Sequence, residues 1–182
     1  MSRQFVITVF GSSRPAEGSA QFTLAHGVGK ALAQAGYIVC NGGYGGTMKA
    51  SASGAKEAGG STLGIVTKYF SRIPNKWIDT TIDTPTIIDR LMELVKRADG
   101  YIVLAGGTGT LLEFACVWEL MSKGVIREKP IVVVGNFWDR VIETVKEELI
   151  SEGLKDCSQY VTRVVSAEEC VKVLDRALKS SI

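Results

Sequence analysis

The sequence is poor in the residues that build metal centres and catalytic triads. His26 is the only histidine among 182 residues, so a metal site with two histidine ligands is excluded. A Ser-His-Asp triad would depend on this one residue. The cysteines Cys40, Cys116, Cys157 and Cys170 form no C-x-x-C pair, which is typical of reduced, mostly buried thiols. We therefore expect neither a metal site nor a bound cofactor.

Long apolar runs are also absent. Residues 101–105 and 131–134 are among the longest, far below the roughly 20 residues that cross a bilayer. The first residues lead directly into a short apolar stretch, without the longer apolar region of a secretory signal. No run of lysine and arginine exceeds two residues, and the net charge is only +2. These features predict a cytoplasmic protein with neither a membrane nor a nucleic acid as its partner.

The composition that remains is that of an ordinary globular chain. Hydrophobic residues make up 46% and charged residues 22%, which excludes a disordered or collagen-like protein. A length of 182 residues predicts a single domain over residues 1–182. Glycine is the exception, because its 20 residues exceed the usual share and are clustered along the chain.

Short apolar strands alternate with amphipathic helices along the whole sequence. The spacing predicts strands over 5–10, 37–40, 62–66, 101–104, 130–134 and 160–165, with a further short strand over 80–82 inside an irregular stretch, 68–85. It predicts helices over 20–35, 86–98, 111–122, 139–150 and 167–178, and an alanine-rich helix that ends before residue 59. Parallel neighbours need crossover connections, so this order predicts an α/β fold: a doubly wound, Rossmann-like parallel sheet of six or seven strands with helices on both faces.

Three predicted strand-to-helix turns carry unusual residues. They are Gly11, Ser12 and Ser13; Gly42, Gly43, Gly46 and Met48; and Gly106, Gly107, Thr108, Gly109 and Thr110. The carboxyl ends of parallel strands share one edge of a sheet, so we expect the three turns to meet there. Glycine lets backbone amides approach a ligand closely, and helix N-termini favour anions, which together predict a phosphate-binding site. The alternative is that these glycines only permit tight turns.

The turns do not match the common nucleotide fingerprints. Met48 and Leu112 stand where a third glycine of G-x-G-x-x-G would be, and no Walker sequence is present. This favours a single phosphate held by backbone amides over a pyrophosphate.

Two charged residues accompany the turns. Glu113 lies in an almost wholly apolar helical segment, so its carboxylate must be hydrogen-bonded, paired or placed at a ligand site. Thr110 and Glu113 also have the spacing of a capping box, which would satisfy the carboxylate without any catalytic role. Arg90 lies on the flank of the predicted helix over 86–98, where most arginines are solvated.

The combination of Gly42-Gly43-x-x-Gly46-x-Met48 with Arg90 and the segment from Ala105 to Glu113 resembles the Lonely Guy (LOG) family of nucleoside 5′-monophosphate phosphoribohydrolases. The resemblance covers residues 5–150 approximately. It implies a Rossmann-like protein that forms a homodimer or a higher homo-oligomer, in which Glu113 is the catalytic glutamate and Arg90, a conserved arginine, is the second catalytic residue. The substrate implied is a small phosphorylated molecule, whose N-glycosidic bond is hydrolysed to the free base and ribose 5-phosphate.

The sequence departs from the family's motifs at Asn41, Ala105 and Leu112, which stand where members carry a glycine, a proline and an acidic residue. A related branch resembles the molybdenum cofactor carrier proteins, so a non-catalytic carrier of a nucleotide or a phosphorylated pterin is the alternative. Members of the LOG family are often called lysine decarboxylases. Pyridoxal chemistry needs a Schiff-base lysine, and no motif position supplies one.

Overall fold

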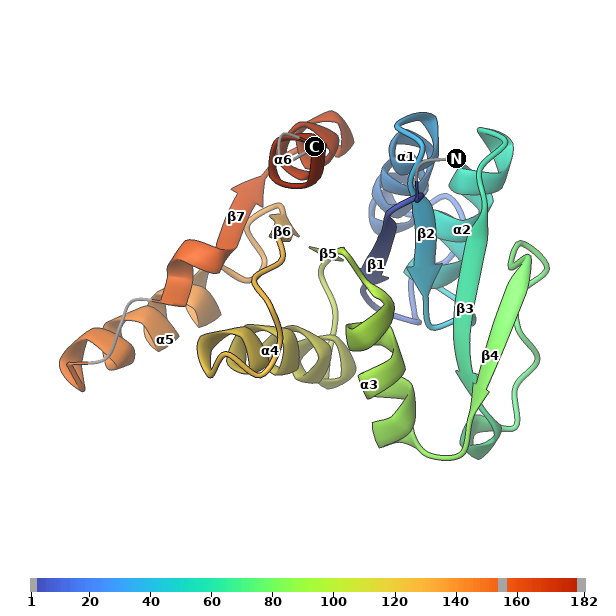
Figure 1. Ribbon diagram of the computed structural model, residues 1–182. Coiled ribbons are helices and arrows are strands. Elements are labelled where there is room, and N and C mark those ends of the chain that lie inside the picture. Colours follow the sequence, from blue (N-terminus) through green and yellow to red (C-terminus); the bar gives the residue numbers. More distant parts are fainter. Residues whose placement is uncertain (1–2, 154–156, 180–182) are drawn as a thin grey trace.

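The computed structural model describes residues 3–153 and 157–179, which form one sheet with helices on both sides (Figure 1). The strands are β1 (Val6–Phe10), β2 (Ile38–Asn41), β3 (Thr62–Thr67), β4 (Thr80–Thr84), β5 (Gly100–Val103), β6 (Ile131–Val134) and β7 (Val161–Val164). The α-helices are α1 (Ala20–Gln34), α2 (Thr47–Glu57), α3 (Ile87–Arg97), α4 (Thr108–Ser122), α5 (Asp139–Ser151) and α6 (Ala167–Lys179). Short 3-10 helices occupy η1 (Lys68–Phe70) and η2 (Cys157–Tyr160).

The seven strands are all parallel and lie in the order β4-β3-β2-β1-β5-β6-β7. The chain builds outward from β1 to one edge, returns to the other side of β1 at β5, and then builds toward the opposite edge. The α/β doubly wound fold predicted from the sequence is confirmed. Its topological switch point lies between β1 and β5, where ligands bind in folds of this class.

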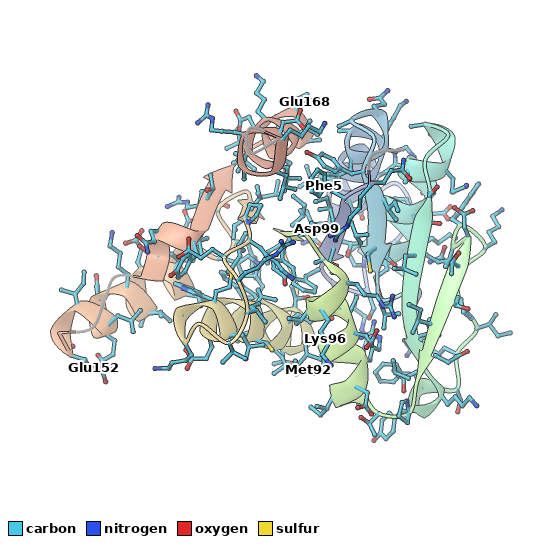
Figure 2. The ribbon with its side chains drawn as sticks, in the orientation of Figure 1. Phe5, Met92, Lys96, Asp99, Glu152 and Glu168 are labelled. Atoms are coloured by element: carbon cyan, nitrogen blue, oxygen red, sulfur yellow. The ribbon has the colours of Figure 1, made fainter. Side chains whose placement is uncertain are left out.

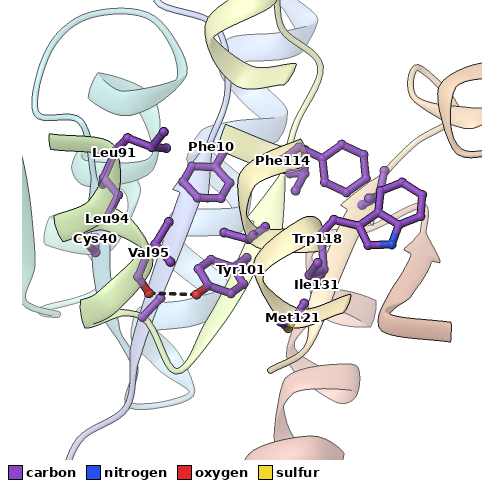
Figure 3. Packing of buried hydrophobic residues seen from close by; sticks show 14 of the residues in the cluster. Phe10, Cys40, Leu91, Leu94, Val95, Tyr101, Phe114, Trp118, Met121 and Ile131 are labelled. Atoms are coloured by element: carbon purple, nitrogen blue, oxygen red, sulfur yellow. Dashed lines mark hydrogen bonds between the residues drawn. The ribbon is translucent and has the colours of Figure 1, made fainter. Parts of the chain in front are cut away.

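The centre of the sheet is buried on both faces because β1, β5 and β6 consist almost wholly of apolar residues, whereas the edge strand β4 is polar and largely exposed. Tyr101 and Val103 of β5 belong to the core beneath α3, α4 and α5, whereas Ile102 belongs to the core beneath α1, α2 and α6. Figure 3 shows the first of these cores, where the Phe10 and Tyr101 rings stack with centroids 5.7 Å apart. The Tyr101 hydroxyl donates a hydrogen bond to the carbonyl oxygen of Val95 over 2.8 Å, so the ring is buried without an unpaired polar atom.

The amino ends of the central strands are joined by a buried carboxylate. Asp99, whose side chain is 1% exposed, accepts hydrogen bonds from Arg3 and Arg127 and from the backbone amide of Val6. Figure 2 shows Asp99 near Phe5, at the start of β1. This anchor holds β1 and β5 together at their amino ends, whereas the glycine-rich turns lie at the carboxyl ends of the strands.

Two elements differ from the sequence-based prediction by more than one residue at a boundary. The strand predicted over 80–82 is the five-residue edge strand β4. Helix α4 begins at Thr108, three residues before the predicted start, so residues predicted as turn form its first helical turn. Cys40, Cys116 and Cys170 are free thiols, and the side chain of Cys157 lies outside the described residues. Within the described ranges, no helix has the length and apolar character needed to span a membrane.

Candidate functional site

A cleft of about 420 Å³ opens at the carboxyl ends of β1, β2, β3 and β5, and we call it the switch-point cleft. Its volume is in the range of small-molecule sites. It is lined by Gly11, Ser12, Ser13, Arg14, Tyr44, Met48, Phe70, Arg72, Arg90, Gly107, Thr108, Gly109, Thr110 and Glu113. Residues far apart in the sequence therefore meet on one cavity.

The N-terminus of α4 forms one wall of the cleft. The helix starts after Gly107 without a side-chain cap. The amides of Thr108, Gly109 and Thr110 have no hydrogen-bond acceptor among the described residues. By contrast, α1 and α3 are capped by Ser19 and Thr86. An uncapped N-terminus facing a cavity offers several donors and a positive partial charge to an anion.

The structure excludes the capping-box interpretation of Glu113. Thr110 is buried inside the first turn of α4 instead of preceding the helix. The carboxylate of Glu113 lies 3.8 Å from the guanidinium of Arg90, and its side chain is 16% exposed. Burial raises the pKa of Glu113 to about 7, although the nearby positive charge of Arg90 acts in the opposite direction. The residue can therefore exchange a proton near neutral pH.

Arg90 is buried rather than solvated. Its Nε donates a hydrogen bond to the carbonyl oxygen of Ile65 over 2.8 Å, and its guanidinium carbon lies 5.7 Å and 5.9 Å from the ring centroids of Tyr44 and Phe70. Burial lowers the pKa of Arg90, while the Glu113 carboxylate raises it. The chain thus holds a cation and a carboxylate together at the wall of the cleft.

The glycines of the three turns differ in what surrounds them. A Cβ atom on Gly107 or Gly109 would have no heavy atom within 4 Å, so these two face open space in the cleft. Gly42, Gly43, Gly46 and Gly106 were also predicted at the phosphate site but do not line the cleft, because their open sides face protein atoms.

Gly42 illustrates the role of the glycines behind the wall. A Cβ atom there would lie 1.6 Å from Nη2 of Arg90 and 2.7 Å from the sulfur of Met48. Gly46 has φ of +62°, and a Cβ atom on it would lie 2.3 Å from the carbonyl oxygen of Ser12. These glycines make room for the buried guanidinium and for the first turn, and so shape the site indirectly.

The first turn is fixed to the second. The amide and the hydroxyl of Thr47 both donate to the carbonyl oxygen of Ser12, at 2.9 Å and 3.0 Å. The start of α2 is therefore already bonded to protein, and α4 is the helix whose N-terminus faces the cleft uncapped. The Ser12 hydroxyl accepts a hydrogen bond from the amide of Arg14, while Ser13 is exposed at the mouth.

Four residues lining the cleft were missed at the sequence level: Arg14, Tyr44, Phe70 and Arg72. Arg14 directly follows Ser13, so proximity in the chain was an available signal. Tyr44 lies inside the second glycine turn, and its hydroxyl is bonded to both the carbonyl oxygen and the amide of Thr67. Phe70 and Arg72 come from the irregular stretch, whose sequence contains no periodic pattern.

The described residues contain no group of three or more histidine, cysteine, aspartate or glutamate side chains suited to a metal ion. His26 is 3.0 Å from Glu57 and joins α1 to α2, away from the cleft. The groups available for chemistry in the cleft are therefore the amides at the start of α4, the arginines and one carboxyl group with a pKa of about 7.

A model of the SLOG cluster4 family matches residues 4–171. The chain belongs to this family. The resemblance predicted from the glycine turns and Glu113 is confirmed, since SLOG cluster4 and LOG homologues are found together among the relatives.

Two curated relatives show how the similarity is distributed. An uncharacterized protein of Archaeoglobus fulgidus is 33% identical over 126 residues, which are 69% of this chain and 81% of that protein. The cytokinin riboside 5′-monophosphate phosphoribohydrolase of Mycobacterium tuberculosis is 38% identical over 114 residues. This SLOG cluster4 chain spans 60% of the length of that enzyme.

Solved structures share the fold over the full length. The molybdenum cofactor binding protein of Rippkaea orientalis superposes with a TM-score of 0.74 at 23% identity, covering 97% of this chain and 98% of that chain. At this identity the likeness shows the common fold.

One departure of this SLOG cluster4 chain from the LOG motif has a structural explanation. Asn41 stands in place of a glycine, is fully buried and bonds within its own turn. Its amide nitrogen donates to the carbonyl oxygen of Met48 and to the Ser51 hydroxyl, and its oxygen accepts from the amide of Gly43. The side chain thus closes the second glycine turn.

Proposed function

We propose that this protein hydrolyses the N-glycosidic bond of a nucleoside 5′-monophosphate to the free base and ribose 5-phosphate. The observation that carries the proposal is that one cleft contains both the uncapped N-terminus of α4 and the carboxyl group of Glu113 with a pKa near 7. The uncapped N-terminus of α4 suits a phosphate group. The carboxyl group suits a sugar on which positive charge develops, and it can accept a proton from the attacking water. The similarity to the Mycobacterium tuberculosis enzyme supports the same reaction.

In this mechanism the amides of Thr108, Gly109 and Thr110 bind the 5′-phosphate and orient the ribose. The bond between C1′ and the base nitrogen lengthens, and positive charge develops on the sugar, as in other glycoside hydrolyses. Ionised Glu113 stabilises that charge and accepts a proton from the water that attacks C1′. The base nitrogen leaves with the bonding electrons and takes up a proton.

We propose that Arg90 contributes to the same step through its effect on the pKa of Glu113. Its positive charge opposes the effect of burial on the Glu113 carboxyl, so it increases the ionised fraction at neutral pH. The hydrogen bond from Arg90 to Ile65 holds the guanidinium in this position.

The substitution Glu113→Gln tests the proposal. It keeps the shape of the side chain but removes the charge, so release of ribose 5-phosphate from AMP should fall by about 10² to 10³-fold. The matched control is Glu93→Gln on α3, whose carboxylate pairs with Arg97 outside both the cleft and the α4–α5 groove, so turnover should not change. If the Glu113 variant hydrolyses AMP at the parent rate, the assignment of this residue is wrong.

The second candidate is a carrier that binds the phosphorylated ligand and leaves it intact. The fold shared with the molybdenum cofactor binding protein of Rippkaea orientalis supports this alternative. Purified protein should be incubated with a panel of nucleoside monophosphates and assayed for ribose 5-phosphate, with binding measured by calorimetry. Product above a control without enzyme rejects the carrier, whereas tight binding without product rejects the hydrolase.

We further propose that the chain forms a homodimer through α4 and α5. A groove of about 370 Å³ between these helices is lined by apolar side chains such as Leu111, Trp118, Val141 and Val145. Leu111 and Val145 are partly exposed on its sides. A second copy of the same surface would cover the groove, as in the isologous interfaces of cyclic dimers.

A further inference from the structure

The side chains of two arginines at the mouth of the switch-point cleft have no partner among the described residues. Arg14 and Arg72 are exposed and line the cleft, and neither makes an ion pair or a side-chain hydrogen bond with the described residues. Five of the other seven arginines pair with carboxylates: Arg3, Arg90, Arg97, Arg127 and Arg163. The remaining two, Arg140 and Arg176, do not line the cleft. Among the described residues, Glu113 is the only acidic side chain that lines the cleft, and it is next to Arg90.

The strand order separates the two arginines along the cleft. Arg14 follows β1, which is directly beside β5, so it lies near the N-terminus of α4. Arg72 continues from β3, which is three strand spacings from β5, or about 14 Å across the sheet. A phosphate at the start of α4 is therefore nearer to the strand that precedes Arg14 than to the strand that precedes Arg72.

The backbone around Arg72 is anchored on both sides. Before it, the Phe70 ring packs edge-on against the buried Tyr44 ring with centroids 5.8 Å apart. After it, the side-chain amide of Asn75 donates to the carbonyl oxygens of Gly43 and Tyr44 at 3.0 Å and 2.8 Å. The segment is thus held at the cleft on both sides of Arg72, whose side chain lines it.

We propose that the ligand carries a second anionic group, at the end remote from its 5′-phosphate, and that Arg72 binds this group. The inference rests on the proposed function for the position of the 5′-phosphate. A phosphate on the ribose and a carboxylate on the base share the chemistry that a guanidinium recognises, two oxygens that accept parallel hydrogen bonds. The substrate class is then nucleoside 5′-monophosphates with an additional acidic group.

Calorimetric titration of the full chain tests the inference, with the substitution Glu113→Gln present so that the ligand is not consumed. The probes are AMP, ADP, adenosine 3′,5′-bisphosphate and adenylosuccinate, whose second anionic groups lie next to the 5′-phosphate, on the ribose or on the base. We expect adenosine 3′,5′-bisphosphate or adenylosuccinate to bind about tenfold more tightly than AMP, the effect of one charged hydrogen bond. ADP should show no such gain. The tighter of the two also identifies the source of the second anion.

Adding Arg72→Gln should remove that tenfold advantage, so that the doubly anionic ligand and AMP bind with similar affinity. Arg14→Gln should weaken all the nucleotides alike, because Arg14 lies near the 5′-phosphate. Arg176→Gln is the matched control, since this exposed arginine on α6 lies away from the cleft.

The inference is overturned if AMP binds but neither doubly anionic ligand binds more tightly, or if the advantage survives Arg72→Gln. In both cases the proposed function stands, because AMP still binds. If no nucleotide binds, the proposed function and the inference fail together.

Discussion

At the scale of single residues, the decisive feature is a carboxyl group that burial keeps partly protonated. Glu113 has a side chain only 16% exposed, and Arg90 compensates for its buried charge incompletely at 3.8 Å. Its pKa of about 7 therefore exceeds its ordinary value of 4.5. An acid or base that acts near pH 7 needs a pKa close to that pH. Burying the charged form of the carboxyl group lowers the free energy of unfolding.

This cost predicts how stability depends on pH. The pKa of Glu113 is higher in the folded chain than in the unfolded chain, so between pH 4.5 and about 7 the folded chain binds more protons. Its contribution to the free energy of unfolding therefore falls as pH rises through this window, by at most about 3 kcal/mol. Glu113→Gln, which imitates the protonated acid, should melt near the parent temperature at pH 4.5 and well above it at pH 8.

Thermal melts of the parent, of Glu113→Gln and of the control Glu93→Gln at both pH values measure this difference. The control should follow the parent at each pH. An equal difference between Glu113→Gln and the parent at pH 4.5 and pH 8 would contradict the assigned pKa.

At the scale of elements, α1 and α2 pack so closely that two glycines are required between them. A Cβ atom on Gly29 of α1 would lie 1.9 Å from the carbonyl oxygen of Ser51, and one on Gly54 of α2 would lie 2.0 Å from that of His26. In both cases the nearest atoms belong to backbone, which cannot rotate away. This contact supports α2, whose start is bonded to the first turn of the cleft through Thr47.

A pair of substitutions in α1 separates packing from helix propensity. Gly27→Ala places a methyl group where no heavy atom lies within 4 Å, so it should raise the free energy of unfolding by about 0.5–1 kcal/mol. Gly29→Ala gains the same propensity but overlaps Ser51, and should lower stability by about 1–3 kcal/mol. Urea unfolding of the two variants checks the opposite signs. If both variants were more stable than the parent, α1 and α2 would be able to move apart at Gly29 without loss of stability, which contradicts the prediction.

At the scale of the whole molecule, the apolar groove between α4 and α5 predicts self-association. Val145→Asp introduces a charge on the rim of the groove, which a second copy would have to bury without a partner. We expect the variant to elute as a monomer where the parent is a dimer, as measured by light scattering. Val165→Asp, at an exposed valine outside the groove, is the control and should leave the parent mass unchanged. A monomeric parent would refute the dimer proposal.

The repeating pattern of the sequence was sufficient to determine the layered α/β fold. Runs such as Ile131–Val134 are apolar at every position, which predicts a strand buried on both faces. The apolar positions of α3 recur at helical spacing, which predicts a helix with one buried face. The grouping of Gly11, Gly107 and Glu113 at one edge also followed from sequence alone, because parallel strands end together.

Only the tertiary structure decided what each site residue contacts. The sequence spacing indicated a capping box between Thr110 and Glu113. In the structure α4 begins at Thr108, so Thr110 does not cap it, and the charged neighbour of Glu113 is Arg90 from α3. Arg72 reaches the cleft through an irregular segment that the packing of Phe70 and Asn75 holds in place. Periodicity reports which face of an element is buried, whereas the pairing of charges depends on distances between elements, and these exist only once the chain has folded.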